Sequence, residues 1–150
     1  MGLGELTRRF PWARFLKFCI VGGTGVVVNY GVYLPLTRWM HVLEETSQAA
    51  SIAVSILTNF VLNEVWTFRD RRSGGAGGFF RRLGQFFLVS LVGAAIQWGV
   101  AMPLCYRTLG LPDMLAVLVG IGVATGWNFL LNLLWTWRKT SAAPPGPPAA

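Results

Sequence analysis

The chain is poor in the residues that soluble enzymes use for chemistry. Charged residues make up 13% of its 150 residues, and it has two cysteines and one histidine. His41 stands between two apolar stretches, and no glycine-rich motif links a predicted strand to a helix. Cys19 and Cys105 are neither in a CxxC motif nor at the spacing of metal ligands. We therefore predict that the chain is not an enzyme and has no catalytic residue, cofactor or metal site.

Hydrophobic residues make up 53% of the chain, more than a water-soluble domain of this size could cover with polar surface. They gather in four stretches of roughly 20 residues, the length that spans about 30 Å of hydrocarbon. The first stretch is too long for a signal peptide and ends in Leu34-Pro35-Leu36 rather than a small-residue cleavage site. The predicted fold class is an all-α membrane protein with four transmembrane helices, at about 15–36, 47–68, 83–106 and 113–137.

The net charge of +7 is unevenly distributed along the chain. Only Arg38 and Arg107 lie in the first and third connections between predicted helices. The other basic residues lie at the two ends and in the central connection: Arg8, Arg9, Arg14, Lys17, Arg69, Arg71, Arg72, Arg81, Arg82, Arg138 and Lys139. The positive-inside rule places both termini in the cytoplasm, in a multi-pass protein of the inner (cytoplasmic) membrane. Membrane lipids account for the basic loop, so we expect no nucleic acid as a partner.

The sequence contains an internal repeat of one helical hairpin. Residues 14–36 align without gaps on residues 82–104. Residues 59–69 align on residues 128–138 through the shared pattern N-F-x-x-N-x-x-W-T-aromatic-R. Each copy has two spans, so both copies enter the membrane in the same direction, as a parallel repeat. The predicted organisation is a cytoplasmic segment at 1–13, a first hairpin at 14–69, a basic Gly-rich cytoplasmic loop at 70–81, a second hairpin at 82–138 and a disordered tail at 139–150.

Amides lie inside all four predicted helices, where polar side chains are costly. They either join helices by hydrogen bonds, at about 0.6–2 kcal/mol each, or line a functional pathway. Asn63 and Asn132 lie near basic helix ends, and with Arg14 and Arg82 they predict one anion-binding site for a phosphate or pyrophosphate. The candidate substrate-binding residues are Arg14, Lys17, Asn29, Asn59, Asn63, Glu64, Trp66, Arg69, Arg82, Gln97, Asn128, Asn132, Trp135 and Arg138.

Glu64 is the only formal charge inside the predicted spans. A carboxylate there is expensive unless it pairs, takes up a proton or reaches the interface. We expect Glu64 to reach the cytoplasmic surface or to pair with Arg14 or Lys17. A role in substrate binding or proton transfer is the alternative.

Several of these motifs occur together in a known family. Arg14-Phe15-x-x-Phe18-x-x-Val21-Gly22 begins the first hairpin, Arg82-x-x-x-Phe86 begins the second, and each hairpin ends in the shared N-F-x-x-N-x-x-W-T pattern. From about Arg14 to Arg138 the chain resembles the GtrA-like family of small four-helix membrane proteins, which is related to membrane domains of some polyprenyl- and dolichol-phosphate sugar synthases. The resemblance implies a translocase (flippase) or carrier-binding protein for polyprenyl-phosphate-linked sugars in cell-surface polysaccharide or glycolipid assembly.

One position departs from the family pattern. Many relatives carry a basic residue directly after the second Asn of the motif, where this chain has Glu64 and Leu133. The departure changes the local charge and leaves the headgroup preference open.

Two other functions are compatible with the sequence. The first is a non-transporting anchor or accessory subunit that recruits a glycosyltransferase through the basic loop. The second is a small multidrug exporter, which the strong charge bias and the position of Glu64 near one interface disfavour. The expected partners are thus a polyprenyl-phosphate-linked sugar and membrane lipids, with a glycosyltransferase in the alternative. A homo-oligomer is also compatible with the sequence.

Overall fold

A computed structural model describes residues 10–138 of the chain, and in this part the predicted all-helical fold is confirmed. Four helices there are long and apolar enough to cross a membrane: Trp12–Arg38, Glu44–Thr67, Gly75–Cys105 and Met114–Thr136. The chain is therefore a multi-pass membrane protein. Most of the segment predicted at 1–13, and the tail predicted at 139–150, lie outside the described residues.

The first hairpin consists of α2 (Trp12–Arg38) and α3 (Glu44–Leu62), and α3 continues into a π-helix, η1 (Asn63–Thr67). Pro35 lies in the last turn of α2, and the helix ends three residues later. His41 then adopts a left-handed backbone with φ of 50°, which reverses the chain toward α3. A short 3-10 turn, η2 (Arg69–Arg71), follows η1.

The second hairpin begins with α4 (Gly75–Ile96). This helix continues through a π-helix, η3 (Gln97–Ala101), into α5 (Met102–Arg107). After a turn at Gly110, with φ of 60°, α6 (Asp113–Leu131) returns and ends in a third π-helix, η4 (Asn132–Thr136). Most observed helices extend beyond the predicted spans by a few residues. The largest difference is at α4, which begins at Gly75 instead of near residue 83.

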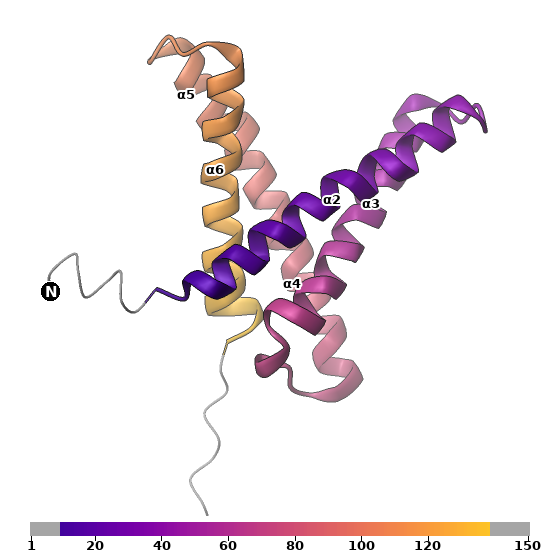
Figure 1. The fold of residues 1–150 in the computed structure, drawn as a ribbon, viewed down its shortest axis with the longest axis vertical. Coiled ribbons are helices and arrows are strands. Elements are labelled where there is room, and N and C mark those ends of the chain that lie inside the picture. The colour runs from indigo at the N-terminus through magenta and orange to yellow at the C-terminus, as the bar shows by residue number, and fades with distance from the viewer. Residues whose placement is uncertain (1–9, 139–150) are drawn as a thin grey trace, which may run out of the picture.

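The two hairpins form the arms of a V (Figure 1). The helices α2 and α3 lie side by side in one arm, and α6 lies beside α4 and α5 in the other. The arms meet at the end where η1 and η4 lie, and a cluster of buried aromatic side chains fills this junction. The cluster contains Phe18, Phe60, Phe68, Phe86, Phe129 and Trp137. Because these rings come from both arms, their packing holds the hairpins together at one end.

Within each arm, one glycine lets two helices approach closely. A Cβ atom on Gly25 of α2 would lie 2.7 Å from Oδ1 of Asn59 in α3. A Cβ atom on Gly93 of α4 would likewise lie 2.7 Å from Oδ1 of Asn128 in α6. The same glycine–asparagine contact thus occurs once in each hairpin, at positions that the sequence repeat aligns.

The connection between the hairpins is shorter than the loop expected at 70–81. Gly74 has φ of 81° and accepts a hydrogen bond from the backbone N–H of Gly78, at 2.8 Å, in the first turn of α4. A Cβ atom on Gly78 would collide with the carbonyl oxygen of Ser73. That same oxygen accepts a hydrogen bond of 2.6 Å from Nη1 of Arg82. The glycines expected to make a flexible connector therefore begin a helix, and Arg82 fixes the turn before it.

Candidate functional site

The N-F-x-x-N-x-x-W-T pattern forms the same local structure in both halves. In η1, the backbone N–H of Phe68 donates to the carbonyl of Asn63 at 2.8 Å, a span of five residues that defines a π-helix. In η4, the N–H of Trp137 donates to the carbonyl of Asn132, also at 2.8 Å. Each asparagine uses its Nδ2 to bond the carbonyl four residues earlier, at 3.0 Å in η1 and 2.8 Å in η4. Single-turn π-helices of this kind occur frequently at functional sites.

The two π-helices differ in one hydrogen bond. In η4 the hydroxyl of Thr136 donates to Oδ1 of Asn132 at 2.7 Å. In η1 the matching atoms, Oδ1 of Asn63 and Oγ1 of Thr67, are both buried, and neither has a partner among residues 10–138. The first half of the repeat therefore has two buried polar groups without a hydrogen-bond partner, whereas the matching two groups of the second half bond each other.

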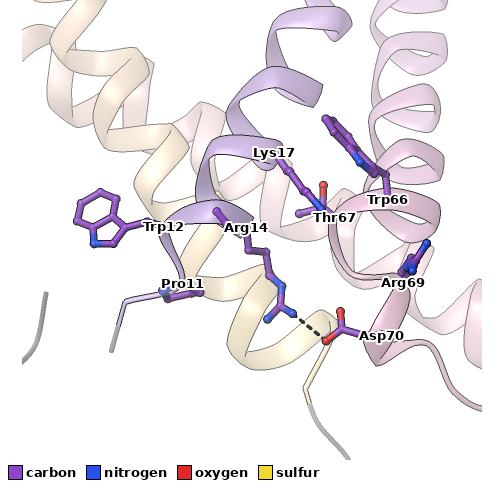
Figure 2. A pocket seen from close by; sticks show the side chains of 9 residues that line it. Pro11, Trp12, Arg14, Lys17, Trp66, Thr67, Arg69 and Asp70 are labelled. Carbon is purple, nitrogen blue, oxygen red and sulfur yellow. Dashed lines mark hydrogen bonds and ion pairs between the residues drawn. The ribbon is translucent and has the colours of Figure 1, made fainter. Parts of the chain in front are cut away.

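A pocket of about 480 Å³ lies between the start of α2 and the segment η1–η2. Figure 2 shows Arg14 and Lys17 of α2 facing Trp66, Thr67, Arg69 and Asp70 across it. Pro11, Trp12 and Ala13 complete its wall. We call it the basic pocket, because three cationic side chains line it beside one carboxylate.

The charges of the basic pocket are held at defined positions. Nη2 of Arg14 contacts Oδ2 of Asp70 at 2.8 Å, in a pair that is partly exposed to solvent. Nζ of Lys17 lies 5.5 Å from the centre of the Trp66 ring, a cation–π contact. Arg71, next to the pocket, donates through Nη1 to the carbonyls of Leu133 and Trp137 at 3.0 and 3.2 Å.

Arg71 thereby joins the inter-hairpin turn to the end of η4, because the last carbonyls of a helix have no partner within the helix and can accept from a side chain. Burial lowers the pKa of Arg71, the positive charge of Arg14 lowers it further, and Asp70 opposes both effects. The guanidinium still remains charged at neutral pH, because its ordinary pKa is far above 7.

Glu64 pairs across the two hairpins, which corrects the expectation that it reaches the surface or pairs with Arg14 or Lys17. Its two carboxylate oxygens accept hydrogen bonds from Arg82, from Nε at 3.0 Å and from Nη2 at 2.6 Å. Nε1 of Trp137 donates to Oε2 of Glu64 at 2.7 Å. We call Glu64, Arg82 and Trp137 the latch; only 4% of Glu64 and 3% of Arg82 is exposed.

The four residues of the predicted anion-binding site, Asn63, Asn132, Arg14 and Arg82, do not line one pocket, because the latch holds Arg82 away from Arg14. Arg14 lines the basic pocket, whereas Arg82 is buried against Glu64. Asn132 is buried and bonded to Thr136, and it lines neither the basic pocket nor a second hollow that lies between the hairpins. The arginine of the second half is thus occupied by the carboxylate that departs from the family pattern.

A second hollow, of about 560 Å³, lies between the two hairpins. Residues from α2, α3, η1, α4 and α6 line it, so all four long helices contribute. Its polar lining consists of Asn59, Asn63, Ser90, Thr125 and Asn128, together with Cys19. We call it the inter-hairpin cavity.

The remaining predicted residues lie outside these two pockets. Asn29 donates to Oγ of Ser51 at 3.1 Å and so joins α2 to α3. Gln97 begins η3 and is half-buried, while Trp135 and Arg138 are exposed.

Sequence reasoning missed three groups near the basic pocket. Thr67 follows Trp66 in the shared motif, so the repeat itself could have identified it. Asp70 and Arg71 lie in the basic loop. A run of mostly basic residues indicates a cytoplasmic loop but does not show which of its side chains pair with Arg14 or with η4.

The chain is similar in sequence to two known proteins over most of its length. It is 36% identical over 139 residues to a dolichol-phosphate mannosyltransferase of Pyrococcus furiosus, a match that covers 90% of this chain and 38% of that protein. It is 22% identical over 121 residues to the uncharacterized membrane protein YngA of Bacillus subtilis, covering 81% of this chain and 77% of YngA. The chain therefore spans well under half the length of the mannosyltransferase. The family model described as GtrA/DPMS, transmembrane domain, matches residues 17–137, and the chain belongs to this family.

Proposed function

We propose that the protein binds a polyprenyl-phosphate-linked sugar at the basic pocket and moves it between the leaflets of the inner (cytoplasmic) membrane. The family match and the dolichol-phosphate named for one relative support this substrate class. Binding and translocation are the activities that we propose for this chain, which corresponds to 38% of that relative.

The chemistry of the basic pocket is the observation that carries the proposal. Arg14, Lys17 and Arg69 line it beside one acidic residue, Asp70, so the site keeps an excess of positive charge. Charged donors of this kind form strong hydrogen bonds to phosphate oxygens. The indole of Trp66 lies in the same wall, and aromatic rings of this type favour the membrane interface, where a lipid phosphate resides.

Affinity measurements on charge variants test the phosphate site. Arg14→Gln and Lys17→Gln should each weaken binding of a hexosyl polyprenyl phosphate in nanodiscs about 10- to 100-fold, because each removes a charge-assisted contact worth about 1.5–3 kcal/mol. Arg38→Gln is the matched control, since Arg38 is exposed at the opposite end of the same helix. The same hexosyl lipid lacking phosphate should bind wild type and variants alike.

If both variants bind like wild type, or if the phosphate makes no difference, the basic pocket is not the lipid-phosphate site. Translocation needs its own measurement, the rate at which the purified chain moves the hexosyl lipid across liposome membranes. A rate equal to that of protein-free liposomes contradicts the translocase proposal.

A second candidate function is a membrane anchor for a glycosyltransferase. The match to only part of a mannosyltransferase favours it, because a membrane domain can hold a catalytic domain at its substrate. Co-purification with a glycosyltransferase, together with unchanged lipid movement in liposomes, would support the anchor over the translocase. A multidrug exporter is disfavoured further by the latch, which already pairs Glu64 with Arg82.

A further inference from the structure

The lining of the inter-hairpin cavity is mostly apolar but includes several amides and hydroxyls, and none of the described residues that line it carries a formal charge. A phosphate would find no cation there, and a cationic drug would find no carboxylate. The volume of about 560 Å³ is within the usual range of ligand pockets, which is about 300–1,000 Å³. The cavity therefore suits a neutral group that has apolar surface together with hydrogen-bonding groups.

Three of its lining residues also carry buried hydrogen-bond acceptors. Oδ1 of Asn59, Asn63 and Asn128 are all buried, and none has a partner in the described part of the chain. The orientation of Asn63 is fixed by chemistry, because its Nδ2 bonds a backbone carbonyl, which can only accept. Its other atom must then be the oxygen, on a side chain that is 1% exposed. A buried acceptor without a donor is costly, so the site calls for a ligand that donates.

Glycines keep the cavity open. Gly22, Gly23 and Gly122 line it, and a Cβ atom on any of them would meet nothing within 4 Å in the described structure. They differ from Gly25 and Gly93, which an asparagine amide contacts closely. Close helix packing explains why residues 25 and 93 are glycines. Gly22, Gly23 and Gly122 instead leave space unfilled.

The cavity also lies next to the basic pocket. Asn63 lines the cavity, and Thr67, four residues later in η1, lines the basic pocket. On α2, Arg14 and Lys17 line the pocket while Phe15 and Phe18 line the cavity. A phosphate in the pocket would thus place an attached group within reach of the cavity.

We propose that the inter-hairpin cavity is a binding site for the neutral sugar of the lipid, whose hydroxyls donate to Oδ1 of Asn59, Asn63 and Asn128. This inference rests on the proposed function and assigns the sugar its own site, separate from that of the phosphate. The buried amide oxygens take the place of water for sugar hydroxyls that would otherwise enter the hydrocarbon without hydrogen-bond partners, which is unfavourable.

The native Cys19 allows a direct test, because it lines the cavity. In full-length protein carrying Cys105→Ala, the rate of Cys19 alkylation by N-ethylmaleimide is measured in nanodiscs with saturating polyprenyl phosphate or hexosyl polyprenyl phosphate. The hexosyl lipid should slow alkylation at least fivefold more than the lipid without sugar. Asn63→Leu should remove that difference, whereas Asn132→Leu should keep it, because Oδ1 of Asn132 is already bonded to Thr136.

A second test uses two glycine variants, so that no buried amide is removed. Gly22→Leu adds a large apolar side chain to the cavity wall at a position where a Cβ atom meets nothing within 4 Å, and it should abolish the affinity gained from the sugar, leaving affinity for polyprenyl phosphate within twofold of wild type. Gly31→Leu is the control, since it lies on the same helix with equal space and outside the cavity.

The outcomes separate this inference from the proposed function. If both lipids bind but protect Cys19 equally, or if Gly22→Leu keeps the sugar-dependent affinity, the sugar does not occupy the cavity and only this inference is overturned. If neither lipid binds the wild-type protein, the proposed function fails as well.

Discussion

At the scale of single residues, Glu64 joins the two hairpins through its side chain. Two carboxylate oxygens receive three hydrogen bonds, two from Arg82 and one from Trp137. Buried ion pairs do not guarantee stability, because removing two charges from water can cost more than their attraction returns. Breaking such a pair on one side is nevertheless strongly destabilising, since the remaining charge is left buried without compensation.

We predict that Arg82→Gln lowers the free energy of unfolding by about 3–5 kcal/mol, because it leaves the Glu64 carboxylate buried and unpaired. Denaturant titration of the purified protein in detergent micelles measures this loss. Arg81→Gln is the matched control, since Arg81 is exposed beside it and should change stability by less than about 0.5 kcal/mol. Equal effects of the two substitutions would show that the latch does not stabilise the fold.

The double variant Glu64→Leu with Arg82→Leu should be more stable than Arg82→Gln alone. Both charges leave together, and the second half of the repeat already has Leu133 at the position of Glu64. A double variant less stable than the single one would mean that the ion pair contributes net stability beyond charge compensation.

At the scale of helices, glycines have two different tasks. Gly25 gives Asn59 room at the α2–α3 contact, and the same place is a hydrogen-bonded contact, because Oγ of Ser55 donates to the carbonyl of Gly25 at 2.8 Å. Gly22, one turn earlier, meets open space. The sequence shows only that both are glycines on one helix face.

We predict that Gly25→Ala destabilises the protein by about 1–3 kcal/mol, because the added methyl group forces the buried Asn59 amide out of its place. Gly22→Ala should be neutral or stabilise by about 0.5–1 kcal/mol, since alanine costs less backbone entropy in a helix. Thermal unfolding of both variants in the same detergent compares them. Similar melting temperatures for the two would contradict the assignment of Gly25 as a packing glycine.

The spans were predictable from sequence, because apolar length and charge placement depend on the bilayer rather than on tertiary contacts. The start of α4 was not, since four glycines within residues 74–78 read as a flexible linker until Arg82 is seen to bond Ser73. The partner of Glu64 was missed for a related reason. A repeat aligns equivalent positions within each hairpin, but it does not reveal which positions of the two hairpins meet.

At the scale of the whole molecule, the hairpins are joined firmly at one end. The latch and the aromatic cluster lie there, and the rings of Phe68 and Trp137 stack with centroids 4.4 Å apart. The arms then diverge toward the turns at His41 and Gly110 (Figure 1). The basic pocket is close to the joined end, so a lipid phosphate would approach the protein where the hairpins are held together.

The last prediction concerns which side of the membrane this joined end faces. Arg38 and Arg107 are near the diverging ends, while the other 11 of the 13 basic residues lie toward the joined end or in the flanking segments. From the positive-inside rule we predict that the joined end and the basic pocket face the cytoplasm. In a protein with Cys19 and Cys105 replaced by alanine, Ser73→Cys should resist a membrane-impermeant maleimide applied to intact cells, whereas Glu44→Cys should react. Both positions are exposed, and both should react after the cells are permeabilised. Labelling at position 73 but not at 44 would invert the topology and put the basic pocket on the outer leaflet, where a lipid-linked sugar made in the cytoplasm could not reach it before crossing.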